Sequence, residues 1–433
     1  MDMPRLPEIW GGLECSFTRV RDSYGDQLDY CGHYRRGVQD IEYIAQVGFR
    51  ALRYPIIWER YKPGQDDVSW DWLERQLNAL RYYNIKPIAG LVHHGSGPIH
   101  ACVNDPCFSK EIEKFAAQVA RKFPWIEYYT PINEPLTTAR FCGLYGFWYP
   151  HKKDAKSFAE ILLNELKATV LSMKAVRKVN PHAKLVQTED LGKTYSTPLL
   201  TYQAEFENER RWLSYDLLCG VVKPGHPMWQ YLTWVGIQED ALAFFIDNPC
   251  PPDIIGADYY ATSERFLDEH INNYPPHVHG SNGKHRYADV EAIRIKLNKP
   301  HGPKVLLQEC WNRYKIPIVI TEVHIHGTAE DQIRWFNHIW STCLDLVKNG
   351  VDIKAVTAWA MFGSYGWSKL LTEPPGEYER GVFDLSPGYP KPTAYTRFLK
   401  ALADDPYFKH PALYEKGWWQ LENRFLMADR IDQ

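Results

Sequence analysis

The sequence predicts a single (β/α)8 TIM barrel, a fold of the α/β class. Eight short apolar runs alternate along the 433 residues with stretches in which apolar residues recur at helical spacing. The runs are continuously apolar, as expected for a parallel sheet that helices cover on the outside. Eight such units close into a barrel. An open, doubly wound sheet would carry a Gly-x-Gly-x-x-Gly turn after its first strand, and the sequence has none there.

The strand and helix candidates follow one another over nearly the whole chain. The strand candidates are Glu8–Phe17, Phe49–Trp58, Ile85–Val92, Ile126–Asn133, Lys184–Thr188, Ile254–Tyr260, Ile316–Thr321 and Ile353–Met361. The helix candidates are Gly37–Val47, Trp70–Tyr83, Lys110–Lys122, Ser157–Val179, Ile237–Ile246 and Asp331–Asn349. No proline- or glycine-rich linker divides them. We therefore expect one catalytic barrel over residues 1–403 and a C-terminal extension, residues 404–433, that packs on the barrel or on a second subunit.

One segment differs from the rest in composition. Residues His270 to His301, between the sixth and seventh strand candidates, are rich in histidine, asparagine, proline and glycine. A βα connection at this position lies over the carboxyl ends of the strands. Long loops of this kind either bind ligands or are disordered, and of the two we favour binding.

Composition and charge exclude several classes of partner. The formal net charge of −3 gives no basic excess for neutralising phosphates, so we expect no nucleic-acid partner. No apolar run is long enough to span a membrane, and Met1 is not followed by the apolar core of a signal peptide. The nine cysteines are scattered, and Cys102 and Cys107 lack further ligands at metal-site spacing. We therefore expect a cytoplasmic protein with free thiols, with no metal or organic cofactor, acting on a small neutral molecule.

Two of the apolar runs end in a glutamate. Glu134 follows Pro131-Ile132-Asn133, and Glu322 follows Ile318-Val319-Ile320-Thr321. The carboxyl ends of the strands form the catalytic face of a TIM barrel, so both carboxylates belong there. One such glutamate alone is more simply explained as a solvated or salt-bridged strand end. Two together are typical of a retaining glycosidase, which needs one carboxylic acid and one nucleophilic carboxylate.

These motifs, together with others in the same order along the chain, resemble those of family 1 glycoside hydrolases, which are retaining β-glycosidases. The matching stretches run from about residue 8 to about residue 400. Besides the two glutamate motifs they are Asp29-Tyr-Cys-Gly-His33 with Asp40, Arg53-Tyr-Pro-Ile-Ile-Trp58, His93-His94, Asp258-Tyr259-Tyr260, and Trp359 with Trp367.

The resemblance implies that Glu134 is the general acid/base and Glu322 the nucleophile. A nucleophile must stay ionised, and Arg53 and Tyr260 are the cation and hydroxyl donor expected beside it. Glu134 must begin protonated, which a second carboxylate and apolar walls would favour. The other substrate-binding residues that the resemblance implies are His94, Asn133, Trp359 and Trp367. Each has a structural explanation as well: Arg53 as an internal ion pair, His94 as a buried hydrogen-bonding group, and the tryptophans as core.

Three departures from the family concern the sugar. Thr18 stands where the family has a glutamine that grips the ring hydroxyls, and Gly366 where it has a glutamate that binds the outer ones. Val323-His324-Ile325-His326 replaces the usual asparagine-glycine after the nucleophile. Loss of two polar side chains weakens ordinary hexose binding, so we expect a different glycone. His324 and His326 lack a third metal ligand at a telling spacing, which favours hydrogen bonding or packing.

Two other functions stay open from the sequence. The same carboxylates serve a transglycosylase that passes the glycosyl group to an acceptor other than water. A non-catalytic sugar-binding or assembly module would also share the fold, but it has no reason to keep a desolvated nucleophile. The sequence leaves the oligomeric state open, a homo-oligomer included.

Overall fold

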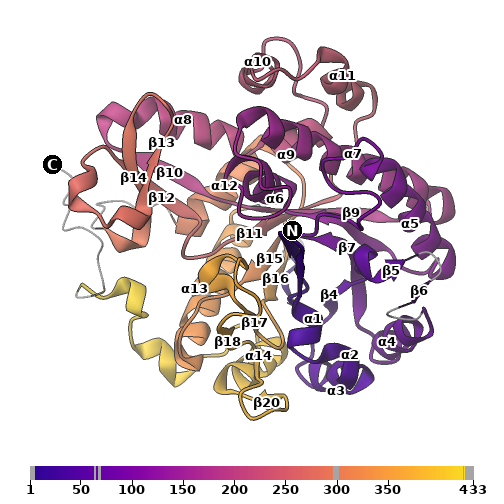
Figure 1. Cartoon of the computed structure of the whole chain (residues 1–433). Helices are drawn as coiled ribbons and strands as arrows, with labels where there is room; N and C mark the ends of the chain where they lie inside the picture. The colour runs from indigo at the N-terminus through magenta and orange to yellow at the C-terminus, as the bar shows by residue number, and fades with distance from the viewer. Residues whose placement is uncertain (1–4, 63–64, 67–69, 296–301, 423, 425–433) are drawn as a thin grey trace.

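Eight parallel strands close into a barrel at the centre of the molecule, and helices surround it (Figure 1). This computed structural model describes residues 5–62, 65–66, 70–295, 302–422 and 424. The barrel strands are β1 (Glu8–Gly12), β4 (Ala51–Pro55), β7 (Lys86–His93), β8 (Tyr128–Asn133), β9 (Lys184–Asp190), β11 (Ile254–Asp258), β15 (Ile318–Val323) and β16 (Ile353–Ala358). They pair in chain order, and β1 closes the ring between β16 and β4. The predicted TIM barrel is confirmed.

A layer of apolar side chains fills the inside of the barrel near the amino ends of the strands. Seven strands each contribute one buried residue, and Tyr128 of β8 packs against them. The seven are Trp10, Ala51, Ile88, Val186, Ile254, Val319 and Ala355. Because this layer closes the barrel from below, the polar side chains at the other end of the strands stand on a rigid floor.

The first predicted strand is only partly correct. The barrel strand ends at Gly12, and the chain continues into a hairpin of β2 (Phe17–Val20) and β3 (Ser23–Asp26). A Cβ atom on Gly12 would lie 2.5 Å from the ring of Trp359, so this strand end admits only glycine without a shift. The close approach brings residues 13–16, which connect β1 to the hairpin, next to the tryptophans that follow β16.

The predicted helices are present with small shifts at their ends. They are α3 (Val38–Ala45), α4 (Trp70–Tyr82), α5 (Phe108–Lys122), α7 (Ala155–Val179), α11 (Glu239–Asp247) and α13 (Ala329–Lys348). The sequence did not predict α1 (Gln27–Tyr30), α2 (His33–Arg36), α6 (Pro135–Ala139), α8 (Thr201–Arg210), α9 (Leu213–Leu218), α10 (Pro227–Trp234), α12 (Gly302–Tyr314) and α14 (Ala394–Asp404). None of the described helices is long and apolar enough to cross a membrane.

The long segment after the sixth barrel strand carries a small sheet that the sequence did not predict. Strands β12 (Glu264–Asp268), β13 (His279–Ser281) and β14 (Arg286–Glu291) join β10 (Lys193–Ser196), which follows the fifth barrel strand, in the order β10-β12-β14-β13. We call this the satellite sheet; it lies to one side of the barrel (Figure 1). It has its own buried cluster, which includes Phe266, Tyr274 and Val290. Residues 296–301 of the segment lie outside the described residues.

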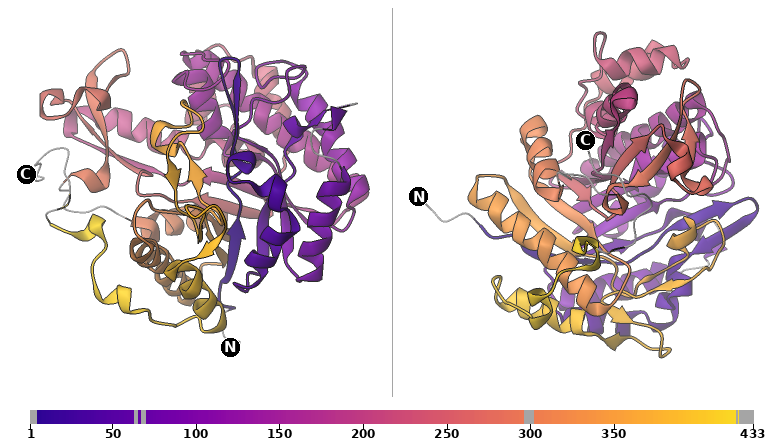
Figure 2. Two further views of the ribbon diagram at one scale, coloured as in Figure 1. Left: turned by 60° about the horizontal axis from the view of Figure 1, so that its bottom comes forward. Right: turned by 90° about the vertical axis from the view of Figure 1, so that its left-hand side faces the viewer.

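The chain beyond α14 runs along the outer helix α13, as Figure 2 shows. Arg334 on α13 donates a hydrogen bond to the carbonyl oxygen of Ala412 at 2.8 Å and forms an ion pair with Glu415. The rings of Trp335 and Trp419 meet edge to face, with centroids 5.0 Å apart. The described part of residues 404–433 thus lies against the barrel, and a domain boundary at residue 403 stays a prediction.

Candidate active site

Glu134 and Glu322 lie together at the carboxyl ends of the barrel strands. Glu134 directly follows β8, and Glu322 lies near the end of β15. One carboxylate oxygen from each, and one from Asp258 at the end of β11, all lie within 4.8 Å of one another. All three side chains are buried, so the barrel holds three carboxyl groups where water reaches them little.

Glu322 is held by the cation and the hydroxyl that the sequence predicted. Arg53, on β4, donates from Nη1 to Oε1 of Glu322 at 2.6 Å, and the hydroxyl of Tyr260 donates to Oε2. Burial raises the pKa of Glu322, while Arg53 and the Tyr260 hydrogen bond oppose that rise. Arg53 and Tyr260 thus lower the pKa of Glu322 as expected, but burial raises it by more.

Asn133 is fixed by three neighbours. Its Oδ1 atom accepts hydrogen bonds from Nη2 of Arg53 at 2.5 Å and from the Thr188 hydroxyl at 2.7 Å. Its Nδ2 atom lies 3.2 Å from Nε2 of His93. Arg53 thus links the residue before Glu134 to Glu322, and both ends of its guanidinium are in use.

Glu134 lies at a backbone position that points its side chain into the barrel mouth. Its φ of 43° is in the left-handed region, and Pro135 then begins α6. His94 Nε2 lies 3.5 Å from the Glu134 carboxylate, and His94 Nδ1 is 2.9 Å from the hydroxyl of Thr138. Burial lowers the pKa of His94 to about 3, so this contact is not an ion pair at neutral pH. Burial, followed by Asp258 and Glu322, raises the pKa of Glu134 well above its usual range.

Asp258 is a third carboxyl group between the two glutamates. In the sequence it belongs to the Asp258-Tyr259-Tyr260 motif, from which no role was predicted for it, although it ends an apolar run just as the glutamates do. Its Oδ1 accepts from the Thr321 hydroxyl at 2.6 Å, whereas Oδ2 is buried without a hydroxyl or N–H donor in the described structure. A carboxyl proton shared with Glu134 would supply that donor. Burial and Glu322 both raise the pKa of Asp258, which favours such a proton.

Glu189, at the end of β9, braces the turn that carries Glu134. Its Oε1 accepts from the backbone N–H of Leu136 at 2.6 Å and from the hydroxyl of Ser214 at 2.5 Å. Burial raises the pKa of Glu189 to about 8, although both of these hydrogen bonds oppose the rise. Glu189 is therefore a protonated carboxyl group over most of the neutral range.

We expect the raised pKa of Glu189 to make stability depend on pH. In the unfolded chain this carboxyl group ionises near its ordinary pKa, so between about pH 5 and pH 8 the unfolded state binds fewer protons. Stability should therefore fall as pH rises through that window, and Glu189→Gln should reduce the slope by about 1.4 kcal/mol per pH unit. Urea unfolding at pH 5 to 9 measures this. Glu127→Gln, at an exposed carboxylate, is the control, and an equal slope in wild type and Glu189→Gln would contradict the assignment.

The two predicted tryptophans border the site and share one partner, Glu14. The indole Nε1 atoms of Trp359 and Trp367 each lie 3.2 Å from Oε2 of Glu14. The Trp359 ring stacks on His93, with centroids 5.5 Å apart, and lies 4.6 Å from the Arg53 guanidinium carbon. Sequence reasoning missed Glu14, which lies two residues beyond the end of β1, because residues 8–17 were interpreted as one strand.

The three departures from the family occupy definite places. Thr18 is buried in the hairpin strand β2. Gly366 has φ 78°, and a Cβ there would lie 2.8 Å from the carbonyl oxygen of Pro375, so a glutamate would be strained. His324 Nε2 and His326 Nδ1 lie 3.2 Å and 3.6 Å from the same oxygen of Glu379. Both histidines are thus engaged with a carboxylate that the sequence did not single out.

The oxygens of Glu134, Asp258 and Glu322 are close enough for a divalent cation, but the surroundings favour protons. Arg53 is already bonded to Glu322, and its charge would repel a metal ion. Elsewhere in the described ranges, Glu209, Asp216 and His226 lie near one another, but Arg313 forms ion pairs with both carboxylates. Both groups of carboxylates are thus held by hydrogen bonds and ion pairs to neighbouring side chains.

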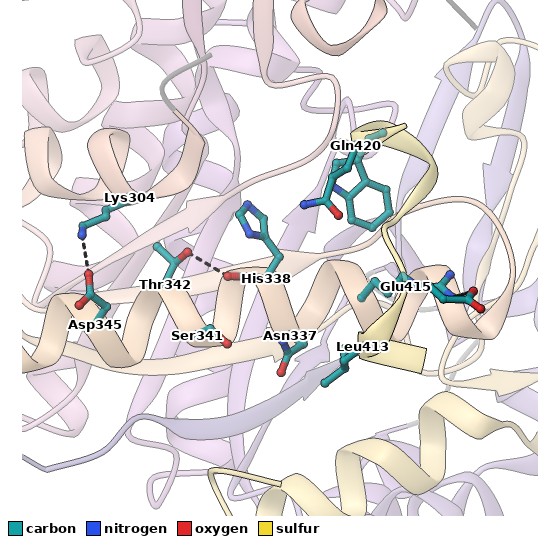
Figure 3. A pocket seen from close by; sticks show the side chains of 11 residues that line it. Lys304, Asn337, His338, Ser341, Thr342, Asp345, Leu413, Glu415 and Gln420 are labelled. Atoms are coloured by element: carbon teal, nitrogen blue, oxygen red, sulfur yellow. Dashed lines mark hydrogen bonds and ion pairs between the residues drawn. The ribbon is translucent and has the colours of Figure 1, made fainter. Parts of the chain in front are cut away.

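A hollow of about 400 Å³ lies elsewhere, on the outside of the barrel between α13 and the C-terminal segment (Figure 3). Of its charged side chains, Lys304 is paired with Asp345 at 2.5 Å, and Arg334 is paired with Glu415. The two carboxylates that line it, Asp345 and Glu415, are the partners in those two ion pairs. The carboxyl end of the barrel is therefore the candidate active site although this hollow is roomy.

Comparison with known proteins agrees with the geometry. Residues 9–376 match the model of the family described as Glycosyl hydrolase family 1. Aryl-phospho-beta-D-glucosidase BglC of Bacillus subtilis is 21% identical over 77% of this chain and 78% of its own length. A 6-phospho-beta-glucosidase of Dickeya chrysanthemi is 23% identical over 75% of each chain. The structure of a family 1 β-glucosidase from Thermotoga maritima superposes with a TM-score of 0.74 and 16% identity, covering 94% of this chain and 100% of that one.

Proposed function

This chain belongs to glycosyl hydrolase family 1 and is a glycoside hydrolase, and we propose from that premise that it cleaves β-glycosides with retention of configuration. The observation that carries the proposal is the approach of a Glu134 oxygen to within 4.8 Å of a Glu322 oxygen. Measured between whole carboxyl groups, retaining pairs stand about 5–5.5 Å apart and inverting pairs, which leave room for a water molecule, about 6.5–9.5 Å. Nearest oxygens within 4.8 Å of each other favour the shorter separation. A pair this close supports direct attack by one carboxylate.

In the first step Glu322 attacks the anomeric carbon. The bond from that carbon to the leaving oxygen breaks, and Glu134 gives its proton to the leaving oxygen. The pKa values of Glu134 and Asp258, which contact no arginine or lysine in the described structure, are raised well above their usual range, and this supports protons on these two groups. The charge then stays on Glu322, where Arg53 and Tyr260 stabilise it.

In the second step water releases the sugar. Esterification has removed the charge of Glu322, and Glu134 is now ionised and takes a proton from the attacking water. The bond between the anomeric carbon and Glu322 breaks, which restores both residues. Two displacements at one carbon give a product with the configuration of the substrate.

We infer that the side chains that bind the glycone differ from those usual in the family. The related proteins named above are described as acting on aryl-phospho-β-glucosides and 6-phospho-β-glucosides, which makes phosphorylated and unmodified β-glucosides the first substrates to test. With Thr18 and Gly366 at the two altered positions, neither of the usual side chains for the outer hydroxyls is present. An atypical mode of glycone recognition follows.

The stereochemistry of the first product tests the proposal. We expect proton NMR, started immediately after enzyme is added to a nitrophenyl β-glycoside that it cleaves, to show the β-anomer of the free sugar before mutarotation. Release of the α-anomer would contradict retention. A sugar acceptor in a parallel reaction separates hydrolysis from glycosyl transfer to another sugar, because transfer yields a new glycoside in place of the free sugar.

A further inference from the structure

We propose that Glu14 is a specificity-determining residue that binds the outer hydroxyls of the glycone, and that the glycone is neutral and not anionic. This inference rests on the proposed function, because it names the sugar that Glu134 and Glu322 act on. Glu14 is connected with both altered positions: it precedes Thr18 by four residues in the chain, and it accepts a hydrogen bond from Trp367, the neighbour of Gly366. It therefore brings a carboxylate against the two tryptophans that border the site, where the usual polar side chains at positions 18 and 366 are missing.

The two oxygens of Glu14 are held differently. Oε1 accepts two hydrogen bonds from Ser16, from the backbone N–H at 3.0 Å and from the hydroxyl at 2.5 Å. Among the described residues, Oε2 accepts hydrogen bonds only from the two indole N–H groups, both at 3.2 Å, which is long for a bond to a carboxylate. Ser16 thus anchors one oxygen, and the other is held loosely on the side of the partly exposed Trp367.

A sugar hydroxyl improves on this arrangement. A hydroxyl that donates to Oε2 can form the shorter bond typical of a charged acceptor, and each displaced indole N–H can then donate to a sugar oxygen. The exchange leaves no buried donor unpaired. The exchange needs the sugar hydroxyl. A deoxy sugar offers no donor to Glu14, so Oε2 stays bonded to the indoles and the sugar gains no hydrogen bond there.

The charges around the site disfavour an anionic glycone. Four carboxyl groups line it, Glu14, Glu134, Asp258 and Glu322, of which Glu134 and Asp258 carry protons in the proposed mechanism. Within the described chain, Arg53 is the only arginine or lysine that contacts any of the four, and both of its terminal nitrogens are already bonded. His94 is kept neutral by burial, and His324 and His326 face Glu379. A phosphate or carboxylate on the sugar that enters beside Glu14 would meet that carboxyl group, and none of the described contacts of Glu14 is to a lysine or arginine.

The test compares wild type, Glu14→Gln and Glu8→Gln on one series of nitrophenyl β-glycosides. The series holds the parent β-glucoside, its 3-, 4- and 6-deoxy forms, and its 6-phosphate. Glu8→Gln is a matched control, because Glu8 also accepts a hydrogen bond from an indole, that of Trp10 at 3.0 Å, at the opposite end of the same strand. We expect Glu14→Gln to lower kcat/KM for the parent by about 10- to 100-fold, the usual effect of losing a hydrogen bond to a charged group.

The deoxy substrates show whether Glu14 binds a sugar hydroxyl or only holds the two tryptophans in place. For one deoxy substrate, the one that lacks the bonded hydroxyl, wild-type kcat/KM should be lower than for the parent by about the factor that Glu14→Gln causes on the parent. Glu14→Gln should then lower kcat/KM for that deoxy substrate little further. Equal losses for every substrate would show that Glu14 only positions the tryptophans and would overturn the inference. Wild-type turnover of the 6-phosphate at or above the rate of the parent would overturn it as well.

Calorimetric titration keeps this test independent of the proposed function. The same glycosides are titrated into Glu322→Gln and into the double variant Glu14→Gln/Glu322→Gln, which need only bind. A loss of parent binding on changing Glu14, with no binding of the 6-phosphate, supports the inference even if the hydrolysis product contradicts retention. Absence of parent binding to both variants, or unchanged binding between them, overturns it.

Discussion

Replacing Glu322 by glycine should abolish hydrolysis, lowering kcat by at least about 10⁴-fold, as expected when a covalent nucleophile is removed. Arg53 would remain bonded to Asn133, so the pocket should keep its shape apart from the missing carboxylate. The measurement is the steady-state rate on the best nitrophenyl β-glycoside. Asp352→Ala, at a partly exposed carboxylate before β16, is the control and should keep wild-type activity.

Added azide should restore turnover to Glu322→Gly. A small anion enters the space left by the side chain and attacks the anomeric carbon from the face that Glu322 occupied, helped by the charge of Arg53. Only one displacement then takes place, so the product is the α-glycosyl azide, which NMR identifies. A Glu322→Gly variant that hydrolyses at the wild-type rate, or that forms the β-azide, would contradict a nucleophilic role.

Replacing Glu134 by glutamine should slow hydrolysis according to the leaving group. Substrates whose aglycone is a poor leaving group need the proton, and their kcat/KM should fall by about 10²- to 10⁴-fold. Dinitrophenolate leaves without protonation, so the rate of the first step on dinitrophenyl glycosides should fall far less. Parallel assays on alkyl and dinitrophenyl β-glycosides measure the difference, and equal losses on both would contradict the acid role.

The same variant has a second signature, in the pH profile. Wild-type activity should fall at high pH because Glu134, whose pKa is raised by burial and by its carboxyl neighbours, loses the proton it must donate. Glutamine has no proton to lose, so this alkaline fall should be absent in Glu134→Gln. Glu127→Gln, at the amino end of the same strand, should keep the wild-type profile.

The barrel was predictable because its strands are buried on both faces. A strand such as Ile318–Val323 is apolar on every residue until it reaches the site, so hydrophobicity alone locates it. The satellite sheet lacked this signal. Strand β13, His279–Ser281, is polar and partly exposed, and β12 pairs with β10 some seventy residues earlier, a contact that local composition does not report.

The proposed catalytic pair was predictable for a similar reason, because a glutamate after an apolar run is conspicuous. Asp258 has the same signal and was placed in a motif without a role. Glu14 was hidden by the assumption that one strand runs to Phe17, whereas the strand ends at Gly12 under the Trp359 ring. Its partners lie about 350 residues away, so only the closed barrel brings them together.

The satellite sheet has a consequence for how this catalytic face can change. Strand β10 belongs to the connection after β9, and β12 to β14 belong to the connection after β11, so backbone hydrogen bonds join two connections that leave neighbouring barrel strands. In most barrels each connection is a separate unit of variation. Here the two connections share one sheet and must be exchanged together. A chimera that takes only one of them from another barrel would leave β10 or β12 with an unpaired strand edge.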